Sequence, residues 1–166
     1  MFSLRSFVSA LAIVVGLTVL QFQFAPAAKA AATESGEVLS FAAHQINKPF
    51  RLGANGLHRY DCSGLVYRAF LEAHLAKRIG GERTARGYYN WFKRHGKITK
   101  NPRRGDLVVW AKPGRKVSHI GIFYGYNRRG RPLAISALVN PWGVTKHKVN
   151  SIHLPLKAYL HVDLRR

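Results

Sequence analysis

The chain has 166 residues, enough for one compact domain and little more. It carries 27 Lys and Arg residues against 7 Asp and Glu residues, which gives a formal net charge of +20 at pH 7. Such a surface attracts polyanions, so nucleic acid, anionic lipid and the acidic polymers of a bacterial wall are the partners to weigh. Because acidic side chains are few and only one cysteine is present, the composition does not favour a metal site.

The first thirty residues have the order of a secretory signal peptide. Arg5 precedes an uncharged apolar run over residues 7–20, and the motif AKA that ends at Ala30 offers a small-x-small cleavage site. We therefore expect residues 1–30 to be a signal peptide cleaved near Ala30. Residues 31–166 would then form the mature domain, secreted or associated with the cell envelope. An uncleaved membrane anchor is the alternative. Export argues against nucleic acid as a partner.

Two helices are expected early in the mature chain. Apolar residues recur at helical spacing over residues 37–46, and Asn47 is suited to end that helix in the left-handed conformation. The strongest helical pattern covers residues 63–78, and Asp61 is a natural N-cap for it.

A third helix, expected over residues 85–95 with Thr84 as its cap, precedes a change to strand periodicity. Turn residues separate the apolar runs that follow. Strands are expected over residues 106–111, 117–126, 132–138, 144–149 and 159–164. Helices followed by adjacent strands predict an α+β domain in which N-terminal helices pack on an antiparallel β-sheet.

The only cysteine, Cys62, is expected in the first turn of the strongest helix. In an oxidising compartment a lone cysteine is an intermolecular partner or a working thiol, unless it is a buried and inert residue. A helix N-terminus lowers the pKa of a thiol, because free N–H groups and the helix dipole favour the thiolate. The N–H of Cys62 is suited to hold an oxyanion, and Gly64 would let a substrate approach the backbone. This context favours a nucleophile.

A cysteine nucleophile needs a base, usually a histidine that the fold brings near. Among the eight histidines, His119 is the candidate, because it lies in the apolar strand pattern VSHIGIFYG, where a buried imidazole needs a partner. The others are expected to be ordinary polar residues. His147, His153 and His161 in particular are expected to be exposed.

Four stretches, VLSFAAHQINKPFRLG, YDCSGLVYRAF, RRGDLVVW and SHIGIFYG, follow one another along the chain. In this order they resemble the first helix and turn, the nucleophile motif, the Gly-Asp-Leu strand and the base-carrying strand of the NlpC family of bacterial cell-wall cysteine peptidases. The resemblance covers nearly all of residues 31–166 and implies a minimal papain-like fold.

By this resemblance Cys62 is the nucleophile, His119 is the general base, and Ser136 stands where the family has a third polar residue, most often histidine. Serine is a departure, because its hydroxyl carries no charge to stabilise an imidazolium. His147 is the alternative for this role. Phe50 is a second departure, since the family usually has a tyrosine whose hydroxyl is thought to contribute to the oxyanion site. The residues expected around the oxyanion and substrate cleft are Asp61, Ser63, Gly64 and Phe50.

The resemblance implies a peptidase that hydrolyses peptide stems of peptidoglycan, usually between γ-D-glutamate and a diamino acid, through an acyl-enzyme and without a cofactor or metal. We expect a monomer whose basic face binds anionic wall polymers or a membrane surface, with no nucleic acid partner. One alternative is a wall-binding module of the same fold that has lost turnover. A cationic protein that binds polyanions, with an incidental cysteine, is another, and an amidase or acyltransferase of the same fold is a third.

Overall fold

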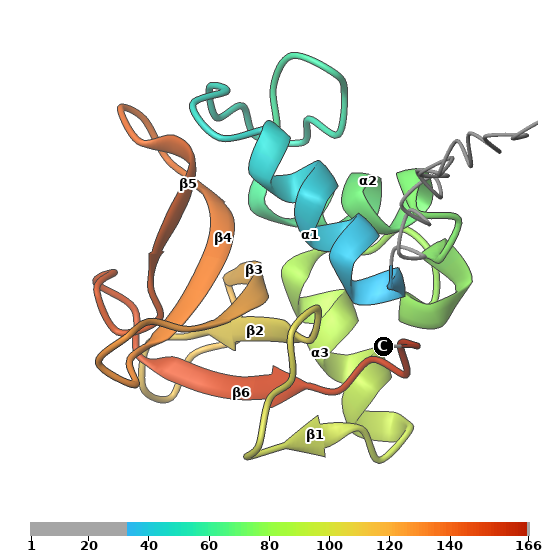
Figure 1. Ribbon diagram of the computed structural model, residues 1–166. Helices are drawn as coiled ribbons and strands as arrows, with labels where there is room; N and C mark the ends of the chain where they lie inside the picture. The colour runs from blue at the N-terminus through green and yellow to red at the C-terminus, as the bar shows by residue number, and fades with distance from the viewer. Residues whose placement is uncertain (1–32, 166) are drawn as a thin grey trace, which may run out of the picture. The chain divides into compact units, whose positions relative to one another are not determined.

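Three α-helices and a six-stranded antiparallel sheet make up the described part of the chain (Figure 1). The structure is a computed structural model, and it describes residues 33–165. The expected signal peptide, residues 1–30, lies outside these described residues. Across the described range no helix combines the length and the apolar character needed to cross a membrane. The expected α+β class, with N-terminal helices on an antiparallel sheet, is confirmed.

Helix α1 (Glu34–His44) begins three residues earlier than expected. The reason is Thr33, whose hydroxyl accepts a hydrogen bond from the N–H of Gly36 and so caps the helix. The helix ends at His44, two residues before the expected end, whereas Asn47 adopts the expected left-handed conformation with a φ of 73°.

Helix α2 (Cys62–Glu72) is shorter than the sequence pattern predicts. The helix was expected to continue to residue 78, but His74 turns into the left-handed region with a φ of 59°. A short 3₁₀ helix, η1 (Ala76–Ile79), follows and ends at Gly80. This break directs Leu75 and Ile79 into the core, where Ile79 is fully buried. Tertiary burial of these two side chains therefore overrides the local helical pattern.

Helix α3 (Ala85–Arg94) is capped by Thr84 as predicted, because the Thr84 hydroxyl accepts a hydrogen bond from Gly87 N–H. Tyr88 and Phe92 are fully buried on its inner face.

The sheet has the strand order β1-β6-β2-β3-β4-β5, and every neighbouring pair is antiparallel. Its strands are β1 (Ile98–Thr99), β2 (Leu107–Trp110), β3 (His119–Tyr126), β4 (Pro132–Leu138), β5 (Gly143–Lys148) and β6 (Leu156–Leu160). The sequence pattern missed β1, which has two residues and pairs only with β6. It also placed the last strand too late, since β6 begins at Leu156 and ends at Leu160.

Both faces of the central strand β2 are buried, which explains its unbroken apolar run. Leu107 and Val109 belong to the main core that the helices cover. Val108 and Trp110 belong to a second, smaller cluster on the other face. The indole N–H of Trp110 donates to the carbonyl of Val149 at 2.9 Å, so this large side chain is fixed behind the sheet.

Asp106, directly before β2, fastens the end of β6 to the sheet. Its side chain is 1% exposed. One carboxylate oxygen accepts from the N–H of Val162 at 2.9 Å, and the other accepts from the N–H of Arg103 at 2.8 Å. His161, expected to be exposed, is half-buried and lies 3.2 Å from the same carboxylate.

We predict that Asp106→Ala lowers the free energy of unfolding by about 3 kcal/mol, because the buried N–H of Val162 and the part-buried N–H of Arg103 lose their acceptor. Urea unfolding followed by circular dichroism measures this change. The matched control is Glu72→Ala, which removes a partly exposed pair with Arg68 on α2 and should cost less than about 0.5 kcal/mol. Equal losses in the two variants would contradict the role given to Asp106.

Candidate active site

The start of α2 is held by the Asp61 side chain. One of its oxygens accepts from the N–H of Gly64 at 2.7 Å and from the hydroxyl of Ser63 at 2.9 Å. The other accepts from the N–H of Gly53 at 2.8 Å. The predicted N-cap is thereby confirmed. The same carboxylate also ties the loop that follows Phe50 to the helix that begins at Cys62.

Gly64 has a packing role that sequence reasoning assigned to the substrate instead. A Cβ atom on Gly64 would lie 2.1 Å from the carbonyl oxygen of Ala54. That carbonyl accepts a hydrogen bond from the N–H of Asp61 at 2.7 Å. The space beside Gly64 is therefore filled by the chain's own loop, which corrects the expectation that a substrate approaches there.

A cleft of about 670 Å³ contains Cys62 and His119 in its lining. Phe50 and Asp61 also line it, whereas Ser63 and Gly64 do not. Of the residues expected around the cleft, the structure thus brings together Cys62, His119, Phe50 and Asp61. Cys62 is a free thiol, in contact with the N-terminal end of β3 through the backbone N–H of Ile120.

A chain of hydrogen bonds runs from His119 across three neighbouring strands. Nε2 of His119 lies 3.0 Å from Oγ of Ser136, and the same Oγ lies 2.8 Å from Nε2 of His147. Nδ1 of His147 lies 2.9 Å from the carbonyl oxygen of Lys148. Ser136 is fully buried. The two alternatives for the third residue are therefore consecutive members of one chain, and the expectation that His147 is exposed is wrong, because it is half-buried here.

The direction of these hydrogen bonds follows from their last member. A carbonyl oxygen only accepts, so Nδ1 of His147 donates to Lys148, and Nε2 of a neutral His147 must accept. The Ser136 hydroxyl therefore donates to His147 and accepts from Nε2–H of His119. This arrangement leaves Nδ1 of a neutral His119 without a proton, in the state of a base.

Sequence reasoning missed two residues beside these hydrogen bonds, Gly121 and Trp110. A Cβ on Gly121 would lie 2.8 Å from the carbonyl of Ile135 and 2.9 Å from Cβ of Ser136, so only glycine lets β4 approach so closely. The ring of Trp110 lies beside both imidazoles, with centroids 5.2 Å from His119 and 5.9 Å from His147. A glycine inside an otherwise apolar strand was the one available signal of this close approach.

Burial controls the protonation of the site. It raises the pKa of the Cys62 thiol to about 11, assisted by the Asp61 carboxylate and opposed by the backbone N–H groups of Ile120, Ser63 and Cys62. The expectation that the helix N-terminus lowers this pKa is thus corrected, because desolvation of the thiolate outweighs the N–H donors. Burial also lowers the pKa of His119 to about 4, with a smaller contribution from the charge of His147. At neutral pH the free site holds a thiol and a neutral imidazole.

Within residues 33–165, no three His, Cys, Asp or Glu side chains are grouped so that they could hold a metal ion.

The chain is similar to known proteins in sequence and in fold. The model of the NlpC/P60 family matches residues 47–137. Murein DD-endopeptidase MepH of Escherichia coli (strain K12) is 33% identical over 102 residues, which is 57% of this chain and 36% of the relative. This chain therefore matches only about a third of the length of that relative.

Solved structures support the same fold. NlpC2 from Trichomonas vaginalis superposes with a TM-score of 0.63 at 20% identity, over 79% of this chain and 48% of that one. The NlpC/p60 domain of the peptidoglycan hydrolase SagA superposes with a TM-score of 0.57 at 20% identity, over 77% of this chain and 98% of that domain. At these identities the likeness shows the fold, which agrees with the expected papain-like arrangement.

We predict that alkylation of the free protein by iodoacetamide rises steeply above pH 9 and has no plateau at neutral pH, because the pKa of Cys62 is raised to about 11. Since Cys62 is the only cysteine, mass spectrometry of the intact chain reports this site alone. A plateau below pH 7 would instead indicate a stable thiolate–imidazolium pair and contradict the dominance of burial.

Proposed function

Because the chain belongs to the NlpC/P60 family, we propose that it is an exported cysteine endopeptidase that hydrolyses peptide stems of bacterial peptidoglycan. The observation that carries the proposal is the shared cleft of Cys62 and His119, with His119 bonded through Ser136 to His147. A nucleophile, a base and groups that orient the base are the parts that peptide hydrolysis by a thiol needs. The names of the relatives, a murein endopeptidase and a peptidoglycan hydrolase, support the choice of substrate.

In the proposed mechanism, Nδ1 of His119 removes the thiol proton of Cys62 as the sulfur attacks the scissile carbonyl. The backbone N–H of Cys62 holds the oxyanion. His119 then gives its proton to the leaving amine, and an acyl-enzyme remains on Cys62. Water, deprotonated by His119, hydrolyses this thioester and restores the free thiol.

Ser136 and His147 act as positioning residues in this proposal. They fix the ring of His119 and keep its proton on Nε2, so that Nδ1 is the basic atom. Neither carries a negative charge, so they orient the imidazolium without neutralising it. Phe50 supplies an apolar wall, where a tyrosine would have supplied a hydroxyl.

Two bonds of the peptidoglycan are candidates. The resemblance noted in the sequence favours the bond between γ-D-glutamate and a diamino acid. The name of the E. coli relative specifies a DD-endopeptidase, which points to a bond between two D-configured centres.

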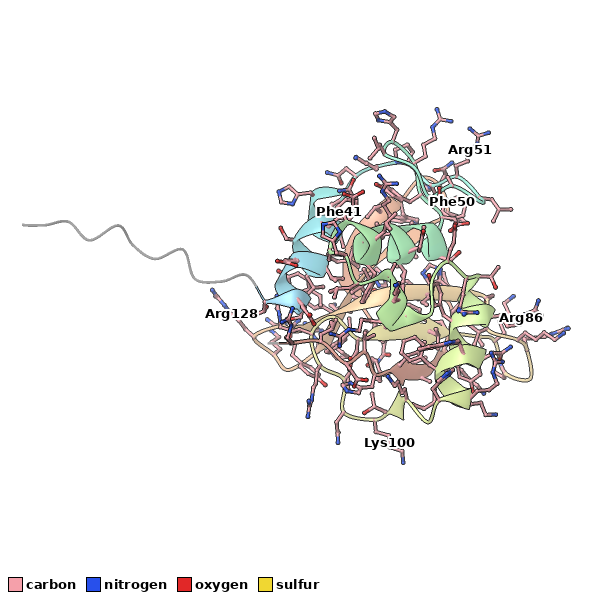
Figure 2. All side chains as sticks on the ribbon, turned by 90° about the vertical axis from the view of Figure 1, so that its right-hand side faces the viewer. Phe41, Phe50, Arg51, Arg86, Lys100 and Arg128 are labelled. Atoms are coloured by element: carbon pink, nitrogen blue, oxygen red, sulfur yellow. The ribbon has the colours of Figure 1, made fainter. Side chains whose placement is uncertain are left out.

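We further propose that the protein is exported, that it is a monomer and that its surface attracts polyanions. Residues 1–30 would direct the chain out of the cytoplasm, and residues 31–166 would act in or near the wall. Basic side chains lie on different sides of the described domain, as Figure 2 shows for Arg51, Arg86 and Lys100. The whole surface, rather than one basic face, would therefore attract anionic wall polymers, and added salt would weaken that attraction.

We predict that the purified protein releases peptide fragments from peptidoglycan and that Cys62→Ala and His119→Ala abolish this release. Mass spectrometry of the fragments identifies the bond by the new amino terminus. The matched control is His44→Ala, an exposed histidine on α1, which should leave the release unchanged. A folded wild-type protein that pellets with the wall and releases nothing would favour the binding module instead.

We predict that Ser136→Ala lowers kcat by about 100-fold, because His119 loses the hydrogen bond that fixes its ring.

We predict that His147→Ala shifts the acid limb of the kcat/KM profile to higher pH. The sign follows from the pKa of about 4 for His119, which His147 helps to depress, so removing His147 raises that pKa and the neutral base is lost earlier on acidification. His147→Gln, whose amide oxygen still accepts from Ser136, should restore part of kcat. An acid limb that does not move would contradict the coupling.

A further inference from the structure

Much of the lining of the active-site cleft is apolar, and we call this part of the lining the apolar arm, although Ser118, Thr145, Ser151 and His153 also line the cleft. The side chains of Leu52, Leu138, Val139, Trp142, Ile152 and Leu154 line it, together with Phe50. They come from the loop before α2, the end of β4 with the turn that follows it, and the segment before β6. Three of them are exposed to solvent, with Leu52 at 84%, Val139 at 65% and Trp142 at 68%. Large apolar side chains exposed together around a cleft are typical of a ligand site.

The cleft has no cationic Lys or Arg in its lining, all within residues 33–165, although the chain is strongly basic and has 27 of these residues. Its one carboxylate, on Asp61, already accepts hydrogen bonds from Gly53, Ser63 and Gly64. A carboxylate of a substrate placed in the apolar arm would therefore lack a cation, and burying an unpaired charge is costly.

We propose that this apolar arm binds an acyl chain, so that the protein also hydrolyses carboxylic esters of medium-length fatty acids. An extended peptide in the arm would bring backbone N–H and C=O groups that the apolar lining residues cannot satisfy. A fatty acyl chain has no such groups, and a cleft of about 670 Å³ has the volume of a small-molecule site. The proposal shares with the proposed function the roles of Cys62 as nucleophile and His119 as base, but not the substrate.

Cys62 and His119 would carry out the ester hydrolysis, as they do the proposed peptide hydrolysis. The sulfur of Cys62 attacks the ester carbonyl while His119 takes the thiol proton. The carbon–oxygen bond breaks, and the alcohol leaves with the proton from His119. Water then attacks the thioester, the fatty acid leaves, and the thiol is restored, so water is the only co-reactant.

The test is the hydrolysis of p-nitrophenyl acetate, butyrate, octanoate and dodecanoate by the full chain, each ester below its critical micelle concentration. We expect kcat/KM to rise about two- to fourfold for each added methylene until the arm is filled, because each buried methylene adds hydrophobic stabilisation. Cys62→Ala should abolish all four rates. Rates that fall with chain length or do not depend on it would overturn the proposal, as would rates that survive Cys62→Ala.

Two variants locate the effect in the arm. Trp142→Ala and Val139→Ser should lower the ratio of octanoate to acetate kcat/KM by about tenfold or more, since several buried methylenes lose contact. Their matched controls are Tyr126→Ala and Ile98→Ser, exposed apolar residues outside the cleft, which should leave the ratio unchanged. An equal loss of kcat/KM for the octanoate and the acetate ester would overturn the assignment of the acyl chain to this arm.

Failure of this inference is distinguishable from failure of the proposed function. If no ester is hydrolysed while peptidoglycan fragments still appear, the acyl site is wrong and the peptidase stands. If esters are hydrolysed by Cys62 and no fragments appear from any wall, the acyl site stands and the peptidoglycan substrate is wrong. If neither reaction occurs in a folded protein, both assignments fail together with the role of Cys62.

Discussion

The Asp61 carboxylate is the constraint on which the rest of the site depends. It accepts hydrogen bonds from Ser63 and Gly64, which fix the first residue of helix α2, and from Gly53, which holds the preceding loop against that helix. Cys62 is thereby fixed at the first position of the helix, beside the start of β3. Because Gly64 has no side chain, the backbone of Ala54 packs directly against it, and the loop lies close to the start of the helix.

The sheet supplies the second half of the site through its register. Ser136 pairs with Thr145, and Ala134 pairs with His147, so His147 lies diagonally across from Ser136. His119 reaches Ser136 over the position of Gly121, where no side chain intervenes. Antiparallel pairing places diagonal neighbours within reach of long side chains, and here it produces two hydrogen bonds in series, from His119 to Ser136 and from Ser136 to His147. The backbone carbonyl of Lys148 accepts from His147 and thereby fixes which atom donates in each of these hydrogen bonds.

Charge is distributed unevenly between the surface and the cleft. The surface carries the excess of Lys and Arg that gives the chain its net charge of +20. The cleft excludes these residues and buries its thiol and imidazole, so both are neutral at neutral pH. Long-range attraction to polyanions and the local selection of a substrate group are therefore separate properties. The first depends on solvent-exposed charge and weakens with salt, whereas the second depends on shape and on burial.

The sequence by itself determined what local chemistry decides. Asp61 and Thr84 predicted two helix starts, the change of period predicted the α+β class, and the apolar pattern around His119 predicted a buried histidine. The end of α2 could not be predicted from the sequence. The turn at His74 is favoured by the burial of Leu75 and Ile79 in a core that distant strands complete. The hydrogen bond between Ser136 and His147 and the raised pKa of Cys62 were also decided by the tertiary structure. Both depend on which groups from distant parts of the chain surround a side chain and remove its water, and no local pattern records that.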